Sequence, residues 1–237
     1  PKDFQTHARL ANSSGTAYPI SPSGGGIWYG DRMYKDLNGD GIIDSKDETA
    51  LGSPIPKFQY GINNTITYKD FSLNIFFSGS YGNKVFNQLA VTQTNPLNNT
   101  SYFTSALNYA KLAMVNPNGL ASDVNNVYVT NPNTTVVSLR NDNTNGNLRP
   151  SNLFIEDGSF LRCKDISLGY QLPKSLLSKV SVQSFRVYVE ATNVFLITKY
   201  KGMDPEVSGW NPLQAGWDNG TYPAPRLFTV GANIVLK

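Results

Sequence analysis

The chain has 237 residues, of which 40% are hydrophobic and only 16% are charged, and its formal net charge at pH 7 is +3. The lysines and arginines are scattered, so the sequence shows no electrostatic footprint for nucleic acid. The single cysteine, Cys163, excludes an intrachain disulfide and any zinc cluster built on thiolates. The many Tyr, Phe, Asn, Ser and Thr residues favour β structure with one polar face.

Residues 1–57 are expected to form a loop region, and their most distinctive stretch is an acidic loop at residues 36–47 with the sequence DLNGDGIIDSKD. Oxygen-bearing side chains stand at loop positions 1, 3, 5, 9 and 12, and Gly41 stands at position 6, where the backbone must turn sharply. This is the ligand spacing of an EF-hand calcium loop, with Asp in place of Glu at the last position. The expected Ca²⁺ ligands are the side chains of Asp36, Asn38, Asp40 and Asp47, the backbone carbonyl of Ile42, and Asp44 directly or through water.

The sequence on either side of this loop is unlike an EF-hand, which has a helix on each flank. Residues 28–35 are expected to be extended, and Pro54 and Pro56 interrupt the stretch that follows. We therefore expect calcium to act as a structural staple that neutralises clustered carboxylates, and not as a switch. The alternative is an Asx-rich turn that holds no metal.

Five segments show the period-two alternation of apolar and polar residues that is typical of β-strands. In the first of them, Phe58 and Ile62 point to one face while Gln59 points to the other. Near the start of the third, Arg162 and Lys164 fall on the apolar parity. The strands are expected at residues 58–68, 71–81, 159–172, 185–198 and 226–236. A short helix is compatible with residues 105–114.

The connections between these strands alternate in length. Two are short, at residues 69–70 and 173–184, whereas residues 82–157 and 199–225 form long loops. Short turns on one side and long loops on the other are typical of an outer-membrane β-barrel, and aromatic residues near both strand ends suit its two interfaces. The sequence contains no run of 18 apolar residues, so it predicts no membrane helix. The alternative is a soluble antiparallel sheet with one buried face.

Five strands are too few to close a barrel, because bacterial outer-membrane barrels begin at about eight strands. Open sheet edges in lipid would also leave backbone groups unpaired, at a large cost in free energy. We therefore expect the chain to be a fragment or one part of a split barrel. The apolar parity is expected to face lipid. The polar residues expected to line the lumen are Gln59, Asn63, Thr65, Asn74, Ser78, Glu190 and Asn233.

Several stretches resemble, in order, the C-terminal part of the SusC/RagA family of TonB-linked outer-membrane transporters of Bacteroidota. These stretches are GDRMYKDLNGDG at residues 30–41, LGSPIPKFQYG at 51–61, EDGSFLR at 156–162, ISLGY at 166–170, ATNVF at 191–195 and DNGTYPAPRLFTVG at 218–231. The resemblance implies an all-β fold, with antiparallel strands at the C-terminal end of a transmembrane barrel of roughly 22 strands and long extracellular loops.

The same resemblance implies a function and a set of partners. The function is import of glycans or peptides across the outer membrane, with a SusD-like surface lipoprotein as the lid and with the loops exposed at the cell surface. Energy would come from TonB, whose contact segment lies with the plug in the N-terminal part of the family, outside this chain. The remaining partners are the rest of the same barrel and the lipid bilayer.

Aromatic residues in the loops are candidates for stacking on sugar rings, although loop aromatics often simply pack. These residues are Trp28, Tyr29, Trp210, Trp217 and Tyr222. A second hypothesis is a non-transporting structural or scaffold barrel in another envelope complex, because a fold does not fix function. With one histidine, one cysteine and no Gly-x-Ser-x-Gly or phosphate loop, the sequence predicts no enzyme activity.

Overall fold

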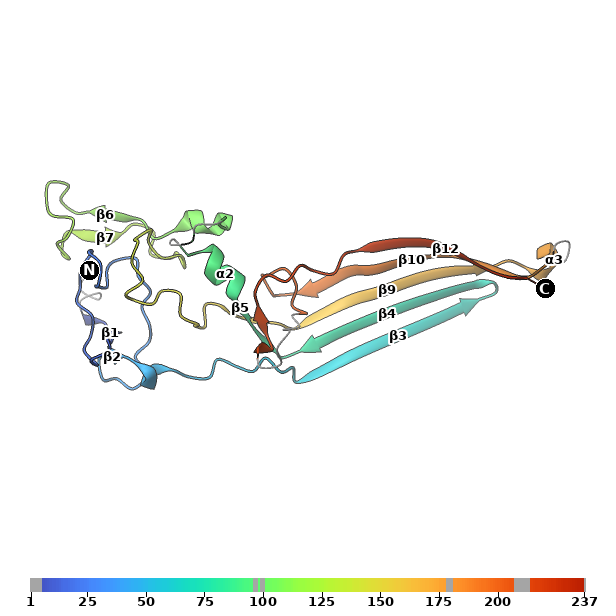
Figure 1. Ribbon diagram of the computed structural model, residues 1–237, viewed down its shortest axis with the longest axis horizontal. Helices are drawn as coiled ribbons and strands as arrows, with labels where there is room; N and C mark the ends of the chain where they lie inside the picture. The colour runs from blue at the N-terminus through green and yellow to red at the C-terminus, as the bar shows by residue number, and fades with distance from the viewer. Residues whose placement is uncertain (1–5, 96–97, 99–100, 178–180, 207–213, 237) are drawn as a thin grey trace. The chain divides into compact units, whose positions relative to one another are not determined.

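The structure is a computed structural model that describes residues 6–95, 98, 101–177, 181–206 and 214–236 (Figure 1). The chain divides into two compact units. The first unit consists of Pro1–Leu51 and Gln88–Phe154, and the second consists of Gly52–Asn87 and Ile155–Lys237. Within the described ranges, no helix is both long and apolar enough to cross a membrane.

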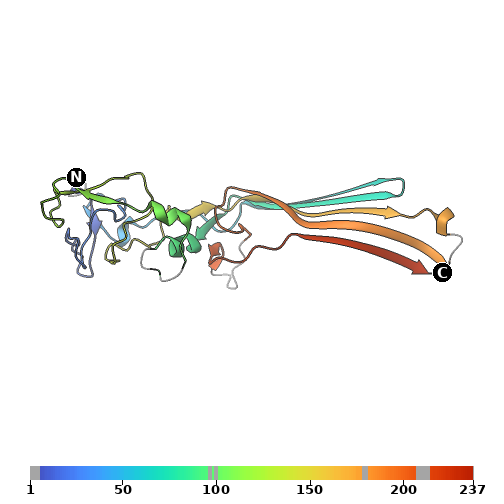
Figure 2. The same ribbon diagram turned by 90° about the horizontal axis from the view of Figure 1, so that it is seen from above.

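The second unit is built on one antiparallel sheet of five strands, in the spatial order β12-β10-β9-β4-β3. Figure 2 shows these strands running together in a single curved layer. The strands are β3 (Phe58–Tyr68), β4 (Phe71–Tyr81), β9 (Phe160–Gln171), β10 (Val182–Thr198) and β12 (Leu227–Leu236). Each lies within one residue of its expected range, except that β10 begins at Val182 and not at residue 185.

Side chains of opposite character occupy the two faces of this sheet, because the register keeps residues of equal parity in line. One row across all five strands is apolar: Ile66, Leu73, Leu168, Val189 and Val230. The next row is polar: Thr65, Asn74, Ser167, Glu190 and Thr229. We call these the apolar face and the polar face. Val230, on the apolar face, is 82% exposed. A non-aqueous medium or a partner must therefore cover this face.

A β-bulge in β9 changes the face of its first residues. Asp165 pairs with Phe76 of β4, but the next pair joins Cys163 to the residue after Phe76, so Lys164 is an extra residue in β9. The bulge places Arg162 opposite Ser78, on the polar face. The expectation that Arg162 and Lys164 lie on the apolar parity is therefore wrong, because strict alternation makes no allowance for an inserted residue.

A smaller sheet joins the loop ends of the second unit, in the order β11-β5-β8. Its strands are β5 (Lys84–Asn87), β8 (Ile155–Asp157) and β11 (Trp217–Asp218), and the short helix α3 (Lys174–Leu177) lies between β9 and β10. The expected long loops thus contain regular structure. Strands of two to four residues are too short to show a period in the sequence.

The first unit contains only short elements in its described residues. They are β1 (Arg9–Leu10), β2 (Ile42–Ile43), the 3₁₀ turns η1 (Ser45–Asp47) and η2 (Thr104–Asn108), α2 (Gln88–Gln93), β6 (Leu112–Met114) and β7 (Val127–Val129). The prediction of a short helix at residues 105–114 is wrong. Only η2 forms a helical turn there, because β6 pairs with β7 and its backbone groups are used in that ladder.

A buried ion pair connects two distant segments of the first unit. The guanidinium of Arg140 lies 2.5 Å from Oδ2 of Asp31, and the two side chains are 14% and 2% exposed. Asp31 also accepts hydrogen bonds from the N–H of Trp28 and the side chain of Asn147. Burial raises the pKa of Asp31, while these hydrogen bonds and Arg140 oppose the rise. The charge of this carboxylate is therefore maintained by its partners.

Replacing Arg140 with Met is expected to destabilise the first unit by about 3–5 kcal/mol, because the Asp31 carboxylate then stays buried without its cation. The measurement is amide hydrogen exchange, followed by mass spectrometry on the whole protein, which should become faster in residues 26–34 and 136–147. Lys111→Met removes an exposed cation and serves as the control, with exchange unchanged. Native-like exchange in the Arg140→Met variant would contradict this role of the pair.

Candidate functional site

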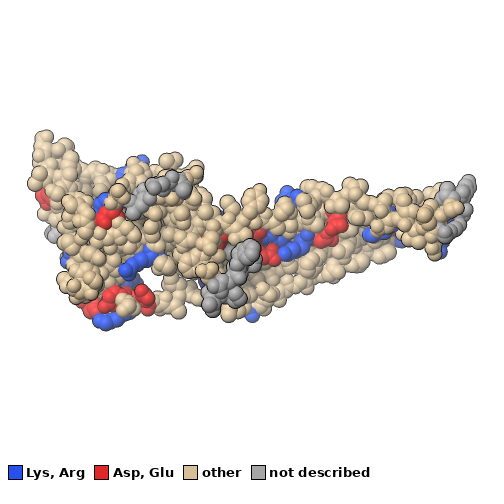
Figure 3. All heavy atoms as spheres, viewed as in Figure 1, with Lys and Arg blue, Asp and Glu red and all other residues tan. Residues whose placement is uncertain are grey.

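The acidic loop holds all six expected calcium ligands in one exposed or half-exposed turn of the first unit. Figure 3 shows Asp and Glu atoms gathered in this part of the unit, at the lower left. Ile43, at the centre of the loop, is 5% exposed and packs with Leu10 and Ile27, which anchors the loop on a small core. Gly41 has a φ of 84°, a conformation that L side chains rarely adopt, where the loop turns sharply.

Backbone N–H groups point at the carboxylates of this loop. Asp36 accepts hydrogen bonds from the N–H groups of Gly39 and Gly41, at 2.6 and 2.8 Å. Asp47 accepts one from the N–H of Leu37 at 2.7 Å, which joins the two ends of the loop. These hydrogen bonds to carboxylate oxygens hold the local fold of the loop.

Lys46 supplies positive charge next to these carboxylates. Its Nζ lies 3.6 Å from Asp40 and 3.7 Å from Asp44. The oxygen ligands of the loop fit Ca²⁺ by type and by spacing. Among the described residues, however, no three His, Cys, Asp or Glu side chains converge closely enough to hold a metal ion. Calcium binding would therefore require the carboxylates to move closer together.

Acidification is expected to loosen the acidic loop. The N–H of Asp44 above all holds the pKa of Asp47 below its ordinary value, and the N–H of Ile42 does the same for Asp40. A lowered pKa in the folded state contributes stability that is fully present above the unfolded pKa of about 3.9 and is lost as pH falls through the folded value. Cleavage within residues 36–47 by an acid-active protease should therefore rise below about pH 4, relative to cleavage of an unstructured peptide.

Four charged side chains form a cluster on the polar face of the sheet in the second unit. Arg162 donates a hydrogen bond to Asp204 at 2.5 Å, and Lys164 donates one to Glu206 at 2.6 Å. The Nε of Arg162 also forms an ion pair with Glu206 at 3.2 Å, although the groups are too poorly aligned for a hydrogen bond. Figure 3 shows basic and acidic atoms side by side over the sheet. We call these residues the four-charge cluster.

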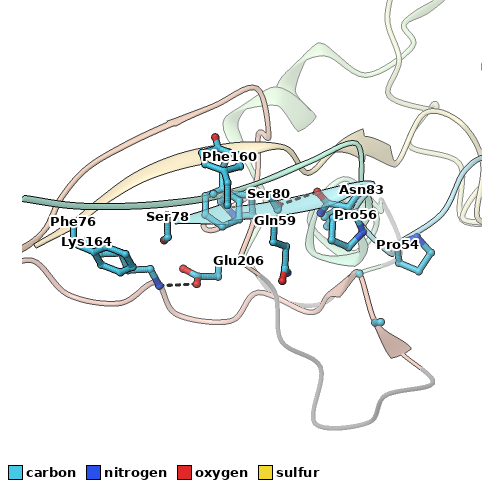
Figure 4. A pocket seen from close by; sticks show the side chains of 16 residues that line it. Pro54, Pro56, Gln59, Phe76, Ser78, Ser80, Asn83, Phe160, Lys164 and Glu206 are labelled. Atoms are coloured by element: carbon cyan, nitrogen blue, oxygen red, sulfur yellow. Dashed lines mark hydrogen bonds and ion pairs between the residues drawn. The ribbon is translucent and has the colours of Figure 1, made fainter. Parts of the chain in front are cut away.

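The four-charge cluster borders a cavity of about 570 Å³, a size that is common for small-molecule sites. Lys164 and Glu206 point toward one another at the edge of the cavity, beside Ser78 and Gln59 (Figure 4). The hydroxyl of Ser78 is buried and has no hydrogen-bond partner among the described residues. Other lining residues are Pro54, Phe76, Asn83 and Phe160. The arrangement combines polar side chains with apolar rings and pairs each charge with an opposite one.

A buried tyrosine–carboxylate pair anchors the loop between β10 and β12 at a second point. The hydroxyl of Tyr200 donates a hydrogen bond to Asp218, a residue that is 1% exposed. Asp218 also accepts a hydrogen bond from the N–H of Gly220 at 2.8 Å. Burial, followed by the hydrogen bond to Asp218, raises the pKa of Tyr200, so its hydroxyl stays protonated and able to donate.

The aromatic residues expected to stack on a ligand lie in different environments. The rings of Trp28 and Tyr29 are buried, at 3% and 6% exposure, so neither presents a face to a ligand in this structure. Trp217 packs edge to face against a phenylalanine of β5, with the ring centroids 4.6 Å apart. Tyr222 is 84% exposed and offers an open ring. Trp210 lies outside the described residues.

Sequence reasoning missed the four-charge cluster and the Tyr200–Asp218 pair. A signal for the cluster was present, because two basic residues broke the alternation of β9 and two acidic residues stood close together in the following loop. No local signal marked Asp218, because its burial comes from the small sheet that β11 joins.

Curated relatives match this chain over most of its length. TonB-dependent receptor P3 of Formosa agariphila is 34% identical over 215 residues, which cover 86% of this chain and 19% of the relative. TonB-dependent receptor P26 of the same organism is 30% identical over 212 residues, or 87% of this chain and 20% of the relative. TonB-dependent receptor SusC of Bacteroides thetaiotaomicron is 31% identical over 206 residues, or 86% and 17%. No protein-family model matches the chain.

Solved structures of the RagAB peptide importer share the fold. Its open-open state superposes with a TM-score of 0.61 and 23% identity, over 88% of this chain and 21% of that chain. A second RagAB structure, described as a peptide transporter, gives a TM-score of 0.57 and 24% identity, over 77% and 17%. These likenesses confirm the expected fold class, in which antiparallel strands form part of a large transmembrane barrel.

The chain is therefore homologous to the TonB-dependent receptors, which are outer-membrane proteins. SusC is one of these relatives, so the resemblance to the SusC/RagA family is confirmed. The relatives are receptors and not enzymes, in agreement with the expected lack of enzyme activity. The chain spans 17–20% of the length of the curated relatives, so the activity, substrates and partners of the whole protein are matters for proposal.

Replacing Tyr200 with Phe is expected to destabilise the small sheet by about 1–3 kcal/mol, because Asp218 keeps its burial but loses one donor. Hydrogen exchange at residues 84–87 and 217–218 should become faster by the factor that corresponds to this loss of stability. Tyr222→Phe removes a hydroxyl from an exposed ring in the same loop and is the matched control. Equal exchange in the two variants would show that the Tyr200 hydroxyl contributes nothing to this anchor.

Proposed function

We propose that this chain forms part of the wall of a TonB-dependent importer that carries glycans or peptides across the outer membrane. The importer works with a SusD-like surface lipoprotein, which closes over the long loops at the cell surface. TonB energises it through the N-terminal part that the family resemblance implies. This proposal requires a barrel of roughly 22 strands, which is the size of the plugged outer-membrane transporters.

The observation that carries this proposal is the two-faced sheet. Its strands have 10 to 17 residues, and a tilted strand needs about 9–11 to cross a membrane. The apolar face would contact lipid, and the polar face would line an aqueous lumen. A soluble sheet would instead bury the apolar face against its own core.

Aromatic pairs at both ends of the sheet support the same orientation. Phe58 and Tyr81 stack at the loop end, with their ring centroids 5.4 Å apart. Phe71 and Tyr170 lie 4.7 Å apart at the end that carries the tight turn. Rings of this kind are enriched where lipid meets water, and two bands of them mark the two interfaces of a barrel.

The first unit supports the proposal of a protein partner. Several large apolar side chains there are exposed: Leu107 is 75% exposed, Leu120 is 73% and Met33 is 57%. Contact with another protein would remove these side chains from water, which is favourable. A SusD-like lipoprotein is the partner that the family resemblance implies, and these residues are candidates for its contacts.

Deletion of the gene is expected to abolish uptake of one class of labelled nutrient. The measurement compares whole-cell uptake of neutral oligosaccharides and of oligopeptides in the deletion strain, in a complemented strain and in a strain without TonB. Loss of uptake in the first and third strains, with restoration in the second, supports the importer. Normal uptake of both classes in the deletion strain, together with loss of an envelope complex, would favour the scaffold hypothesis.

Calcium binding by the acidic loop is part of this proposal. Asp36, Asn38, Asp40 and Asp47 would hold the ion through side chains, together with the Ile42 carbonyl and Asp44. A divalent cation would neutralise carboxylates that otherwise repel one another, and so stiffen the segment before β3. The spacing of these oxygens and the turn at Gly41 support the proposal.

Removal of calcium with a chelator is expected to increase proteolysis within residues 36–47 of the whole protein, because the bound ion stabilises the folded loop. Added Ca²⁺ should restore resistance, whereas Mg²⁺ should not, since it requires a stricter octahedral geometry. Asp36→Asn should abolish the effect of the chelator. Identical cleavage patterns with chelator and with Ca²⁺ would show that the loop is a metal-free turn.

A further inference from the structure

Two basic side chains of a strand meet two acidic side chains of the loop that follows the next strand. Arg162 contacts both Asp204 and Glu206, and Lys164 contacts Glu206 alone. Glu206 therefore joins both cations, at 3.2 Å from Arg162 Nε and 2.6 Å from Lys164 Nζ. Neither the two-faced sheet nor the import role requires these contacts.

The acidic partners are themselves held in a fixed geometry. Asp204 Oδ1 accepts a hydrogen bond from the N–H of Glu206 at 2.9 Å, as well as from Arg162. This bond closes a tight turn around Pro205, which is buried. Both carboxylates therefore face the strand that carries the cations. A turn that presents two acceptors to a guanidinium and an ammonium is a preformed contact surface.

The two ion pairs differ in their exposure to water. The side chains of Arg162 and Asp204 are 5% and 11% exposed, so salt screens this pair weakly. Those of Lys164 and Glu206 are 33% and 42% exposed, so salt screens this pair more strongly. Removing one member of the buried pair leaves its partner uncompensated and is the more costly change.

We propose that Arg162 and Lys164 form a two-point clasp that positions residues 202–206 against the polar face and so fixes one wall of the 570 Å³ cavity. Pro205 and Glu206 line that cavity together with Ser78 of β4. The β9 bulge makes the clasp possible, because it turns Arg162 to the polar face. The clasp belongs to the loop and the sheet, and it operates whether or not the barrel transports a solute.

The clasp is separate from the anchor at Asp218. Tyr200 and Asp218 hold the beginning and the later part of the same loop through the small sheet. Residues 202–206 lie between these points, and among the described residues the hydrogen bonds and ion pairs that join them to β9 are those of the four-charge cluster. Loss of the clasp is therefore expected to free residues 202–206 without loosening the segment around Tyr222.

The test uses a nitroxide label on the full-length protein in detergent. Met203, 50% exposed and next to Asp204, is replaced by cysteine for labelling, while Cys163 is fully buried and stays unlabelled. In low salt, Lys164→Met and Asp204→Asn should each increase the mobility of this label, by about twofold for the exposed pair and by more for the buried pair. A second label at Tyr222→Cys should not respond.

Salt and a conservative variant sharpen the test. High salt should raise the mobility at position 203 in the native background toward that of Lys164→Met, but not as far as that of Asp204→Asn. Lys164→Arg, which keeps the cation next to Glu206, should leave the label at its native mobility. Lys69→Met is the control, because it removes the same charge in the tight turn between β3 and β4.

Two outcomes would overturn the clasp. One is unchanged mobility at position 203 in both Lys164→Met and Asp204→Asn, with barrel assembly confirmed by heat-modifiable migration in gels. The other is an equal rise at positions 203 and 222, which would show general loosening of the loop and no positioning by this cluster. Neither outcome depends on uptake, so a failure of the clasp is distinguishable from a failure of the importer proposal.

Discussion

The hydrogen-bond ladder that β9 makes with β4 on one side and β10 on the other is the constraint on which the second unit depends. From Asp165 onward the ladder keeps apolar and polar rows in line across five strands. At Lys164 one extra residue enters, and the parity of β9 reverses relative to its neighbours. The same ladder therefore produces the apolar face and places two cations on the polar face.

The charge carried by these cations explains how a loop can be held at the end of such a sheet. A polar face that meets water gives little hydrophobic energy with which to pack a loop. Ion pairs and hydrogen bonds from buried or half-buried groups supply the contact instead. The Tyr200–Asp218 pair also holds this loop, but through a neutral hydroxyl that donates to a buried carboxylate within the small sheet.

The first unit uses charge in two contrasting ways. The Arg140–Asp31 pair is buried, so its members depend on one another and on the amides around them. The acidic loop is exposed, and its carboxylates are satisfied by backbone N–H groups and by Lys46. The first arrangement fixes one fold, while the second leaves carboxylate oxygens that a divalent cation can recruit. Both arrangements belong to a chain that is homologous to TonB-dependent receptors.

The sequence by itself determined the five long strands, their order along the chain and the two-faced sheet, because period-two alternation over ten or more residues has one reading. It also carried the family resemblance, whose motifs are local. Only the tertiary structure decided the face of Arg162 and Lys164, since a bulge is a mismatch between strands and cannot be read from one of them. It also decided the burial of Trp28, Tyr29 and Asp218, because those side chains are covered by segments distant in sequence. Contacts between distant residues have no period. The sequence therefore showed two basic residues out of pattern and two neighbouring acidic residues, and only the structure showed that the four form one cluster.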